Sequence, residues 1–374
     1  MKEFIDGNTA VVKASIYSGC NFFAGYPITP ATSILVGMIK ELPQIGGIAI
    51  QAEDEIASIG FCIGAAMTGK KVLTATSGPG LSLYSENIGL AIMAEVPMVI
   101  VDVQRMGPAT GGATTNSEGD IQFIRWITSG GYPIIALSPT DVKSTYELTI
   151  KAFNLAEIFR TPVFLVSSKE LALTKETVDI SELENLPIIN RKKFIGEKFL
   201  PYNFLNLSDT PEISDIGDKN IVRFTTSIHD ERGVITTSKE KIDRKLKHLK
   251  SKIDDRIDEI VDIQKDFQDG SDTMFISYGV TSRSVKEAII LLREKGKKVS
   301  SLVIRSLFPV PEKQILESLK GIKRVIVPEL NIGQYIFEIK RIIPDDVKVI
   351  GINRIDGGLI SPESLIKRFL ETEL

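Results

Sequence analysis

The chain has 374 residues, a formal net charge of −3 and 43% hydrophobic residues, a soluble globular composition with room for two or three domains. The weak negative charge argues against nucleic acid as the main partner, and no apolar run is long enough to span a bilayer. The first residues lack the apolar core of a signal peptide, so we expect a cytoplasmic protein.

The first part of the chain alternates short β-rich runs with amphipathic helical runs. This alternation, with apolar strands, predicts an α/β domain over residues 1–171, in which helices cover both faces of a parallel sheet. The predicted strands are residues 20–24, 48–51, 72–76, 98–103, 133–136 and 163–166. The predicted helices are residues 9–18, 31–42, 55–68, 81–93 and 142–159.

Residues 172–271 break this rhythm and are predicted to form an irregular linker with a turn segment and a long amphipathic helix. Residues 174–219 are polar and carry several prolines, and residues 225–239 contain turn-like sequences. Residues 240–267 are predicted to form one helix, because apolar residues repeat at helical spacing along it. Its other face mixes positive and negative charges, which favours a solvated surface over a nucleic-acid arm.

The alternation resumes after residue 271 and predicts a second, smaller α/β domain over residues 272–374. The predicted strands are residues 273–277, 298–303, 325–327 and 347–351. The predicted helices are residues 282–295, 312–319, 332–342 and 362–370.

Residues 25–30, Gly-Tyr-Pro-Ile-Thr-Pro, join the first predicted strand to a helix. We expect Thr29 at the N-cap of that helix and Pro30 at its first position. The Thr29 hydroxyl and the free N–H groups of the first turn would then offer a site for a small anion such as a carboxylate. The alternative is an ordinary rigid turn between strand and helix.

Three acids follow the second predicted strand within one turn, in the run Gln51-Ala-Glu-Asp-Glu55. Asp54 and Glu55 can be explained as helix N-terminal acids that complement the helix dipole. Glu53 lies closest to the strand end, where a carboxylate could hydrogen-bond a ring nitrogen in a cleft. Glu53 is therefore the candidate functional acid.

Two small-residue loops follow the next strands. Ser77, Gly78, Pro79 and Gly80 form a loop that lets a ligand approach the backbone, although a tight turn explains it equally well on its own. Residues 104–115 form a long loop rich in glycine and threonine, in which Arg105 is the only cation. Arginine binds carboxylates in a bidentate way, so this loop is a candidate anion site, with a flexible surface loop as the alternative.

All four segments follow strands of one predicted sheet. The carboxyl ends of parallel strands meet at the same edge of an open sheet, where ligands bind. We therefore expect these segments to converge on one site.

Together the four segments resemble the α subunit of the 2-oxoacid:ferredoxin oxidoreductases, which are thiamine-diphosphate enzymes. The matching stretches are residues 25–30, 51–56, 74–80 and 103–108, with Gly119-Asp120 and Arg125-Trp126. The details Gln-x-Glu-Asp-Glu, Val-Gln-Arg-x-Gly-Pro and His229-Asp-Glu-x-Gly233 are most similar to the 2-oxoglutarate branch. The resemblance covers nearly the whole chain and is weaker after residue 272.

The resemblance implies a fold and a set of site residues. It implies a pyrimidine-binding domain and a smaller domain like the C-terminal domain of transketolase. Glu53 matches the catalytic glutamate that meets N1′ of the thiamine pyrimidine, and Arg105 matches the arginine that pairs with a substrate carboxylate. The matching substrate-pocket residues are Thr29 and Thr114, and those lining the pyrimidine end of the cofactor are Ser77, Gly78 and Pro79.

The chain lacks two features that a lone catalytic subunit of this family needs. It has no Gly-Asp-Gly motif with paired Asn to hold diphosphate and Mg²⁺, and its two cysteines, Cys20 and Cys62, lie in apolar segments that we expect to be buried, with no CxxC pair. With two histidines, His229 and His248, the composition also argues against a histidine-based metal site. The resemblance therefore implies a β subunit that carries the diphosphate site, Mg²⁺ and the iron–sulfur cluster, in an (αβ)₂ assembly.

The expected reaction is oxidative decarboxylation of 2-oxoglutarate to succinyl-CoA and CO₂, with coenzyme A as acceptor and ferredoxin reduced. Pyruvate or a branched-chain 2-oxoacid is the nearest alternative substrate. A non-redox thiamine enzyme subunit and a non-catalytic binding module are further alternatives. The sequence assigns no role to His229, for which a structural turn and a site role are equally open.

Overall fold

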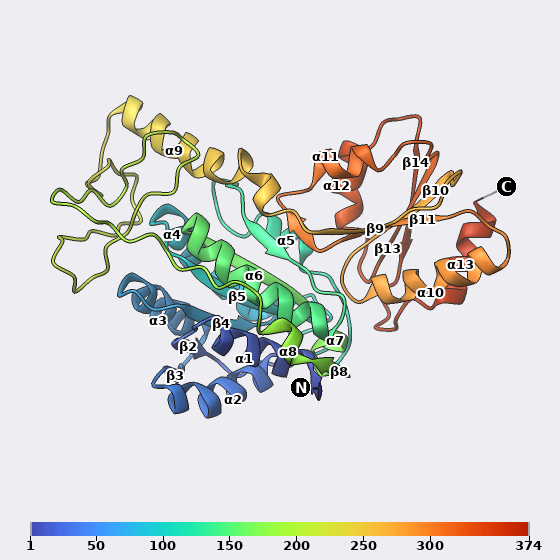
Figure 1. Cartoon of the computed structure of the whole chain (residues 1–374), viewed down its shortest axis with the longest axis horizontal. Coiled ribbons are helices and arrows are strands. Elements are labelled where there is room, and N and C mark those ends of the chain that lie inside the picture. The colour runs from blue at the N-terminus through green and yellow to red at the C-terminus, as the bar shows by residue number, and fades with distance from the viewer. Residues whose placement is uncertain (1, 373–374) are drawn as a thin grey trace.

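The computed structural model describes residues 2–372, which form two α/β units joined by an irregular segment and a long helix (Figure 1). The strands of the larger unit are β2 (Phe22–Gly25), β3 (Ile48–Gln51), β4 (Val72–Thr76), β5 (Met98–Gln104), β6 (Ile135–Leu137), β7 (Pro162–Ser168) and β12 (Ser306–Phe308). They form one sheet in the order β12-β6-β7-β5-β4-β2-β3. All neighbouring strands are parallel except β12, which runs antiparallel to β6, so the predicted parallel sheet is confirmed.

Helices cover both faces of this sheet, as expected. On one face lie α1 (Gly7–Tyr17), α2 (Thr32–Glu41) and α6 (Val142–Phe159), and on the other lie α3 (Glu55–Met67), α4 (Gly78–Met93) and α5 (Ile121–Arg125). Neighbouring strand residues point to opposite faces: Phe22 and Ile100 join the core under α3 and α4, whereas Phe23 and Val101 join the core under α2 and α6. The central strands are therefore largely apolar because both of their faces are buried, whereas the edge strand β3 is partly exposed.

The smaller unit has a five-stranded sheet in the order β14-β13-β10-β11-β9. Its elements are β9 (Ile263–Asp266), β10 (Thr273–Ser277), α10 (Thr281–Glu294), β11 (Ser300–Ile304), α11 (Glu312–Glu317), β13 (Arg324–Glu329), α12 (Tyr335–Ile342), β14 (Lys348–Asn353) and α13 (Pro362–Glu371). Helices α10 and α13 pack on one face, and the other face shares a continuous hydrophobic core with the larger unit. The two units therefore pack directly against each other.

Several short elements depend on pairing between distant segments. Strand β1 (Lys2–Asp6) pairs antiparallel with β8 (Lys175–Asp179), near the short helices α7 (Lys169–Leu173) and α8 (Ile180–Leu183); a 3₁₀ turn (Leu42–Ile45) follows α2. Strand β12 lies within the C-terminal sequence but extends the first sheet. The sequence did not predict β1, β8 or β12, and the domain boundaries after residues 171 and 271 stay a prediction.

The long helix predicted for residues 240–267 is wrong in length. Helix α9 (Lys239–Asp254) ends earlier, and a 3₁₀ turn (Ile257–Glu259) leads into β9. Strand β9 pairs antiparallel with β11, with Ile263 opposite Ile304. These ladder hydrogen bonds replace the last turns of the predicted helix, which helical periodicity alone could not show.

The charged face of α9 is only partly solvated, because three of its polar residues reach into the protein. Lys245, His248 and Lys252 surround the fully buried carboxylate of Glu95, which follows α4. The nitrogen–oxygen distances are 2.5 Å from Lys245, 3.1 Å from His248 and 2.7 Å from Lys252. Burial alone would raise the pKa of Glu95, but these neighbours hold it well below its usual value. The network ties α9 to the larger unit.

Replacing Glu95 by Gln is expected to lower the free energy of unfolding by about 3–5 kcal/mol, because Lys245 and Lys252 would remain buried without an anionic partner. Urea unfolding measures the loss. Asp243→Asn is the matched control, since it removes an exposed ion pair with Lys247 and is expected to cost less than about 1 kcal/mol. Equal losses in the two variants would contradict a stabilising role for the buried network.

Cys20 and Cys62 are free and fully buried, as expected, and burial raises the pKa of each thiol to about 12. Among residues 2–372, no helix has both the length and the apolar character needed to traverse a bilayer.

Candidate active site

The four segments singled out in the sequence lie at one edge of the larger sheet. Strands β5, β4, β2 and β3 are consecutive and parallel, and each segment leaves the carboxyl end of one of them. The predicted convergence of the segments is therefore a property of the fold. What each segment contributes depends on its side-chain geometry.

Arg105 and Thr29 are in direct contact. Arg105 follows β5, and its Nη1 donates a 2.6 Å hydrogen bond to the carbonyl oxygen of Thr29. The Arg105 side chain is buried, its Nε has no hydrogen-bond partner, and no carboxylate within residues 2–372 forms an ion pair with it. A buried guanidinium with unused donors is suited to bind an anion that comes from outside this chain.

The helix start predicted at Thr29 and Pro30 is wrong. Helix α2 begins at Thr32, with Ala31 at its N-cap and no side-chain cap. The turn before it is held instead by Asn8, whose Nδ2 donates to the carbonyl of Pro30 at 2.9 Å. Thr29 is exposed at this turn, so its carbonyl contacts Arg105 while its hydroxyl does not cap the helix.

The three acids after β3 have different environments. Asp54 is the N-cap of α3 and accepts from the Ala57 N–H at 2.7 Å, as its N-terminal position suggested. Glu53 is exposed before the cap. Glu55 is 8% exposed in the first turn, and among the described residues no hydrogen bond or ion pair occupies its carboxylate.

Glu55 points toward the start of α4. A Cβ atom placed on Gly80 would lie 2.7 Å from Oε1 of Glu55 and 2.1 Å from Oγ1 of Thr76. Glycine at this position therefore lets the Thr76 and Glu55 side chains pack directly against the backbone at the start of α4. From the sequence, Glu55 was explained only as an acid that complements the helix dipole. Its position in the first turn, one residue after the Asp54 cap, was the available signal.

The loop after β4 places polar groups at the amino end of α4. Ser77 is the N-cap of this helix, and its buried Oγ has no partner in the described chain. A Cβ on Gly78 would lie 2.9 Å from both carboxylate oxygens of Asp120. The start of α4, at Ser77, Gly78 and Pro79, therefore lies between two carboxylates. Asp120 packs against Gly78, and Glu55 packs against Gly80.

Asp102 is fully buried and Asp120 is partly buried, and the sequence motifs gave neither acid a role. Burial, reinforced by the neighbouring Asp120, raises the pKa of Asp102 well above its usual value, and both of its oxygens lack partners. Burial also raises the pKa of Asp120 to about 6, against the opposing effect of Arg105. Asp102 is the one charged residue in the apolar strand β5, which was the available sequence signal.

Thr114 and His229 are not brought into this cluster by any described contact. Thr114 is exposed on the loop after Arg105. His229 is buried against the ring of Tyr202, and its Nδ1 donates to the Ser227 carbonyl at 2.8 Å. Burial, with a contribution from Lys245, lowers the pKa of His229 to about 4. His229 therefore belongs to the surroundings of the Glu95 network.

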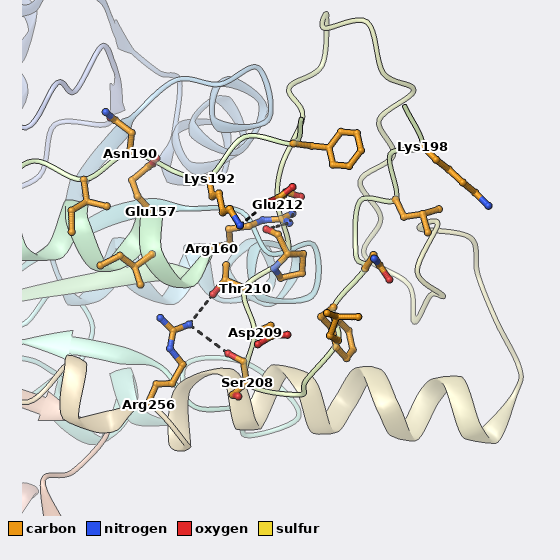
Figure 2. Close-up of a pocket in the computed structure, with 18 residues that line it drawn as sticks. Glu157, Arg160, Asn190, Lys192, Lys198, Ser208, Asp209, Thr210, Glu212 and Arg256 are labelled. Atoms are coloured by element: carbon orange, nitrogen blue, oxygen red, sulfur yellow. Dashed lines mark hydrogen bonds and ion pairs between the residues drawn. The ribbon is translucent and has the colours of Figure 1, made fainter. Parts of the chain in front are cut away.

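A cavity of about 640 Å³ lies beneath the irregular segment, lined by residues that include Arg160, Lys192 and Arg256 (Figure 2). Arg160 precedes β7, so this cavity is at the amino edge of the sheet, opposite the four segments. Arg160 donates to the carbonyls of Pro201 and Pro211, and Lys192 pairs with Glu212. Its polar groups are largely engaged in holding the segment in place.

No group of three or more His, Cys, Asp or Glu side chains in the described part of the chain is arranged to hold a metal ion. The cluster at the carboxyl edge consists of the buried Arg105, the Glu55 carboxylate, the acids Asp102 and Asp120, and the glycine-containing start of α4.

Two protein families match the chain. Residues 13–248 match the family described as pyruvate flavodoxin/ferredoxin oxidoreductase, thiamine-diphosphate-binding, and residues 271–365 match pyruvate:ferredoxin oxidoreductase core domain II. The 2-oxoglutarate synthase subunit KorA of Methanocaldococcus jannaschii is 43% identical over 98% of this chain and 99% of its own length. The KorA subunit of Archaeoglobus fulgidus is 38% identical over 100% of this chain and 99% of its own length. Ketoisovalerate oxidoreductase subunit VorB of Methanothermobacter marburgensis is 30% identical over 99% of this chain and 97% of its own length.

Solved structures agree with these matches. A 2-oxoglutarate:ferredoxin oxidoreductase from Magnetococcus marinus, solved with 2-oxoglutarate, coenzyme A and succinyl-CoA bound, superposes with a TM-score of 0.93 at 34% identity. The match covers 99% of this chain and 65% of that chain, so this chain spans about two thirds of that protein's length. A split-gene transketolase matches with a TM-score of 0.55 at 12% identity, over 99% of this chain and 98% of that chain, and shows likeness of fold alone.

Proposed function

The chain belongs to the 2-oxoacid:ferredoxin oxidoreductase family, in its 2-oxoglutarate branch, and on that premise we propose that it supplies the pyrimidine-binding half of a shared active site. The reaction is oxidative decarboxylation of 2-oxoglutarate to succinyl-CoA and CO₂, with electrons passed to ferredoxin. The KorA relatives, similar over almost their whole length, support this substrate.

The observation that carries the proposal is the burial of the Arg105 side chain and its lack of an ion pair in the described chain. Its guanidinium is buried, is held by the Thr29 carbonyl at 2.6 Å, and lacks a carboxylate partner in the described chain. Asp120 is close enough for Arg105 to affect its pKa, but no direct ion pair joins the two side chains, and Nε of Arg105 has no hydrogen-bond partner. A buried guanidinium with unused donors is costly, so a substrate carboxylate that pairs with it relieves this cost on binding. Arg105 is proposed to bind and orient the 2-oxoacid.

Thiamine diphosphate supplies an electron sink that makes loss of CO₂ from a 2-oxoacid feasible. The residues at the edge suit its pyrimidine ring, since Glu55 offers an unoccupied carboxylate packed against Gly80, and the buried Ser77 hydroxyl beside Gly78 has no partner in the described chain. We propose that Glu55 holds a proton at the N1′ position of that ring. Glu53, the acid expected from the sequence, is the rival for this role, and Ser77 and Pro79 line the same ring.

The remaining parts of the site are proposed to come from a partner. The chain lacks a Gly-Asp-Gly motif and a CxxC pair, so a β subunit is proposed to carry the diphosphate site, Mg²⁺ and an iron–sulfur cluster, in an (αβ)₂ assembly. Thr114, exposed on the loop after Arg105, is proposed to complete the substrate pocket when that subunit covers the edge.

The test is an assay of the complex co-expressed with its partner subunit. We expect coenzyme A-dependent ferredoxin reduction with 2-oxoglutarate preferred over pyruvate and 2-oxoisovalerate, and an iron–sulfur absorption band in the purified complex. Preference for 2-oxoisovalerate would move the chain to the branch of its VorB relative. A complex without redox centres, or a stable monomer that binds a 2-oxoacid by itself, would overturn the proposal.

A further inference from the structure

The loop that carries the substrate arginine is clamped from behind by the smaller unit. Gln334, at the start of α12, donates from Nε2 to the Gly119 carbonyl at 2.5 Å and accepts at Oε1 from the Gln122 N–H at 3.0 Å. Its own carbonyl accepts from Nε2 of Gln122 at 3.1 Å. One side chain thus holds the backbone on both sides of Asp120.

Glu118 joins the two units at the same place. Its N–H donates to the Leu330 carbonyl at 3.0 Å, and its carbonyl accepts from Nδ2 of Asn331 at 2.7 Å. Its side chain reaches the amino end of α10, where Oε1 accepts from the Val280 N–H at 3.1 Å. Gly279 is required there, because a Cβ would lie 2.2 Å from that oxygen. Residues of both units therefore form this contact.

A second contact holds the beginning of the loop. Gly357, in the segment between β14 and α13, lies so close to Thr115 that a Cβ would be 2.2 Å from its Cγ2 and 3.3 Å from Cε of Met106. Within the loop, the Met106 N–H donates to the Thr115 carbonyl at 3.0 Å. The loop is thus supported near both of its ends by the smaller unit.

The clamped segment leads directly to the proposed substrate site. The Asp120 N–H donates to Oε1 of Gln104 at 3.0 Å, and Gln104 immediately precedes Arg105. The Asp120 carboxylate lies against Gly78. A shift of the clamped backbone would therefore move Asp120 and disturb its hydrogen bond to Gln104, the residue before Arg105.

We propose that the smaller unit sets the affinity for the 2-oxoacid by holding the loop at residues 106–120, and that Gln334 is the positioning residue of this clamp. The inference rests on the role proposed for Arg105. It assigns a function to the smaller unit, which contributes no residue to the Arg105–Thr29 contact.

Gln334→Ala in the assembled complex is expected to raise KM for 2-oxoglutarate about fivefold, with kcat changed less than about twofold. Hydrogen exchange of the amides in residues 106–120 is expected to become faster. Ser117→Ala, which removes one 3.0 Å hydrogen bond to the Leu330 carbonyl, tests the same clamp more mildly. Ile332→Ala is the matched control, because Ile332 is an exposed residue two positions before Gln334.

Unchanged exchange or an unchanged KM in Gln334→Ala would overturn the inference, as would an equal change in Ile332→Ala. If Arg105→Ala leaves KM unchanged, the proposed function of Arg105 fails, whereas the exchange measurement on Gln334→Ala still reports on the clamp. The two failures can therefore be distinguished.

Discussion

Replacing Glu55 by Gln is expected to lower kcat of the assembled complex by about 10²- to 10⁴-fold, the range for loss of a positioned acid–base group. The amide retains the size of the side chain but cannot hold a proton for the ring nitrogen. Glu55 is the acid whose free carboxylate lies beside Gly80, in the first turn of α3. Turnover is measured as ferredoxin reduction at saturating 2-oxoglutarate and coenzyme A.

Glu53→Gln is the matched variant, two residues away on the exposed side of the Asp54 cap. We expect its kcat to fall less than about tenfold. Co-purification with the partner and the unfolding temperature show whether either variant fails to assemble. A large loss in Glu53→Gln with little loss in Glu55→Gln would return the catalytic role to the acid expected from the sequence.

Replacing Arg105 by Ala is expected to lower kcat/KM for 2-oxoglutarate by about 30- to 10³-fold, the effect of deleting one member of a buried, hydrogen-bonded charge pair. Most of the loss is expected in KM, because the guanidinium contacts the substrate carboxylate before and during the reaction. Arg105→Lys is expected to recover only part of it, since an ammonium lacks the fork that matches a carboxylate.

Arg232→Ala is a suitable control for Arg105, because Arg232 is an exposed arginine that pairs with Asp230 near His229. Its kcat/KM is expected to equal that of the unmodified complex. Ferredoxin reduction measured over a range of 2-oxoglutarate concentrations separates KM from kcat. Normal reduction by the Arg105→Ala complex at low substrate would remove Arg105 from substrate binding.

Much of the fold could be predicted from the sequence because it follows from local patterns. Apolar runs alternating with amphipathic helical runs predicted the parallel sheet, and residues 20–24 and 72–76 correspond closely to β2 and β4. The direction of parallel strands then placed Thr29, Arg105 and the loop at Ser77 on one edge. These inferences need only the period of the side chains and the rule that parallel strands end together.

The structure decided which side chains face the site and where helices begin and end, because a shift of one or two residues along a helix turns a side chain to another face. Successive residues at the start of a helix point about 100° apart, so composition cannot tell which acid near Asp54 faces the glycine loop. The start of α2 at Thr32 and the end of α9 at Asp254 depend on contacts with Asn8 and with β11, which are distant in sequence.

The sequence by itself determined the fold class, the edge that carries the site and the family resemblance, because these follow from periodicity and from motifs that stay together along the chain. Only the tertiary structure showed that Arg105 is buried and forms no ion pair within residues 2–372, and that Asp102 is a buried acid with Asp120 partly buried beside it. It also showed that Gln334 of the smaller unit hydrogen-bonds the backbone at Gly119 and Gln122. Burial and pairing are set by segments far apart in sequence, so no local pattern encodes them.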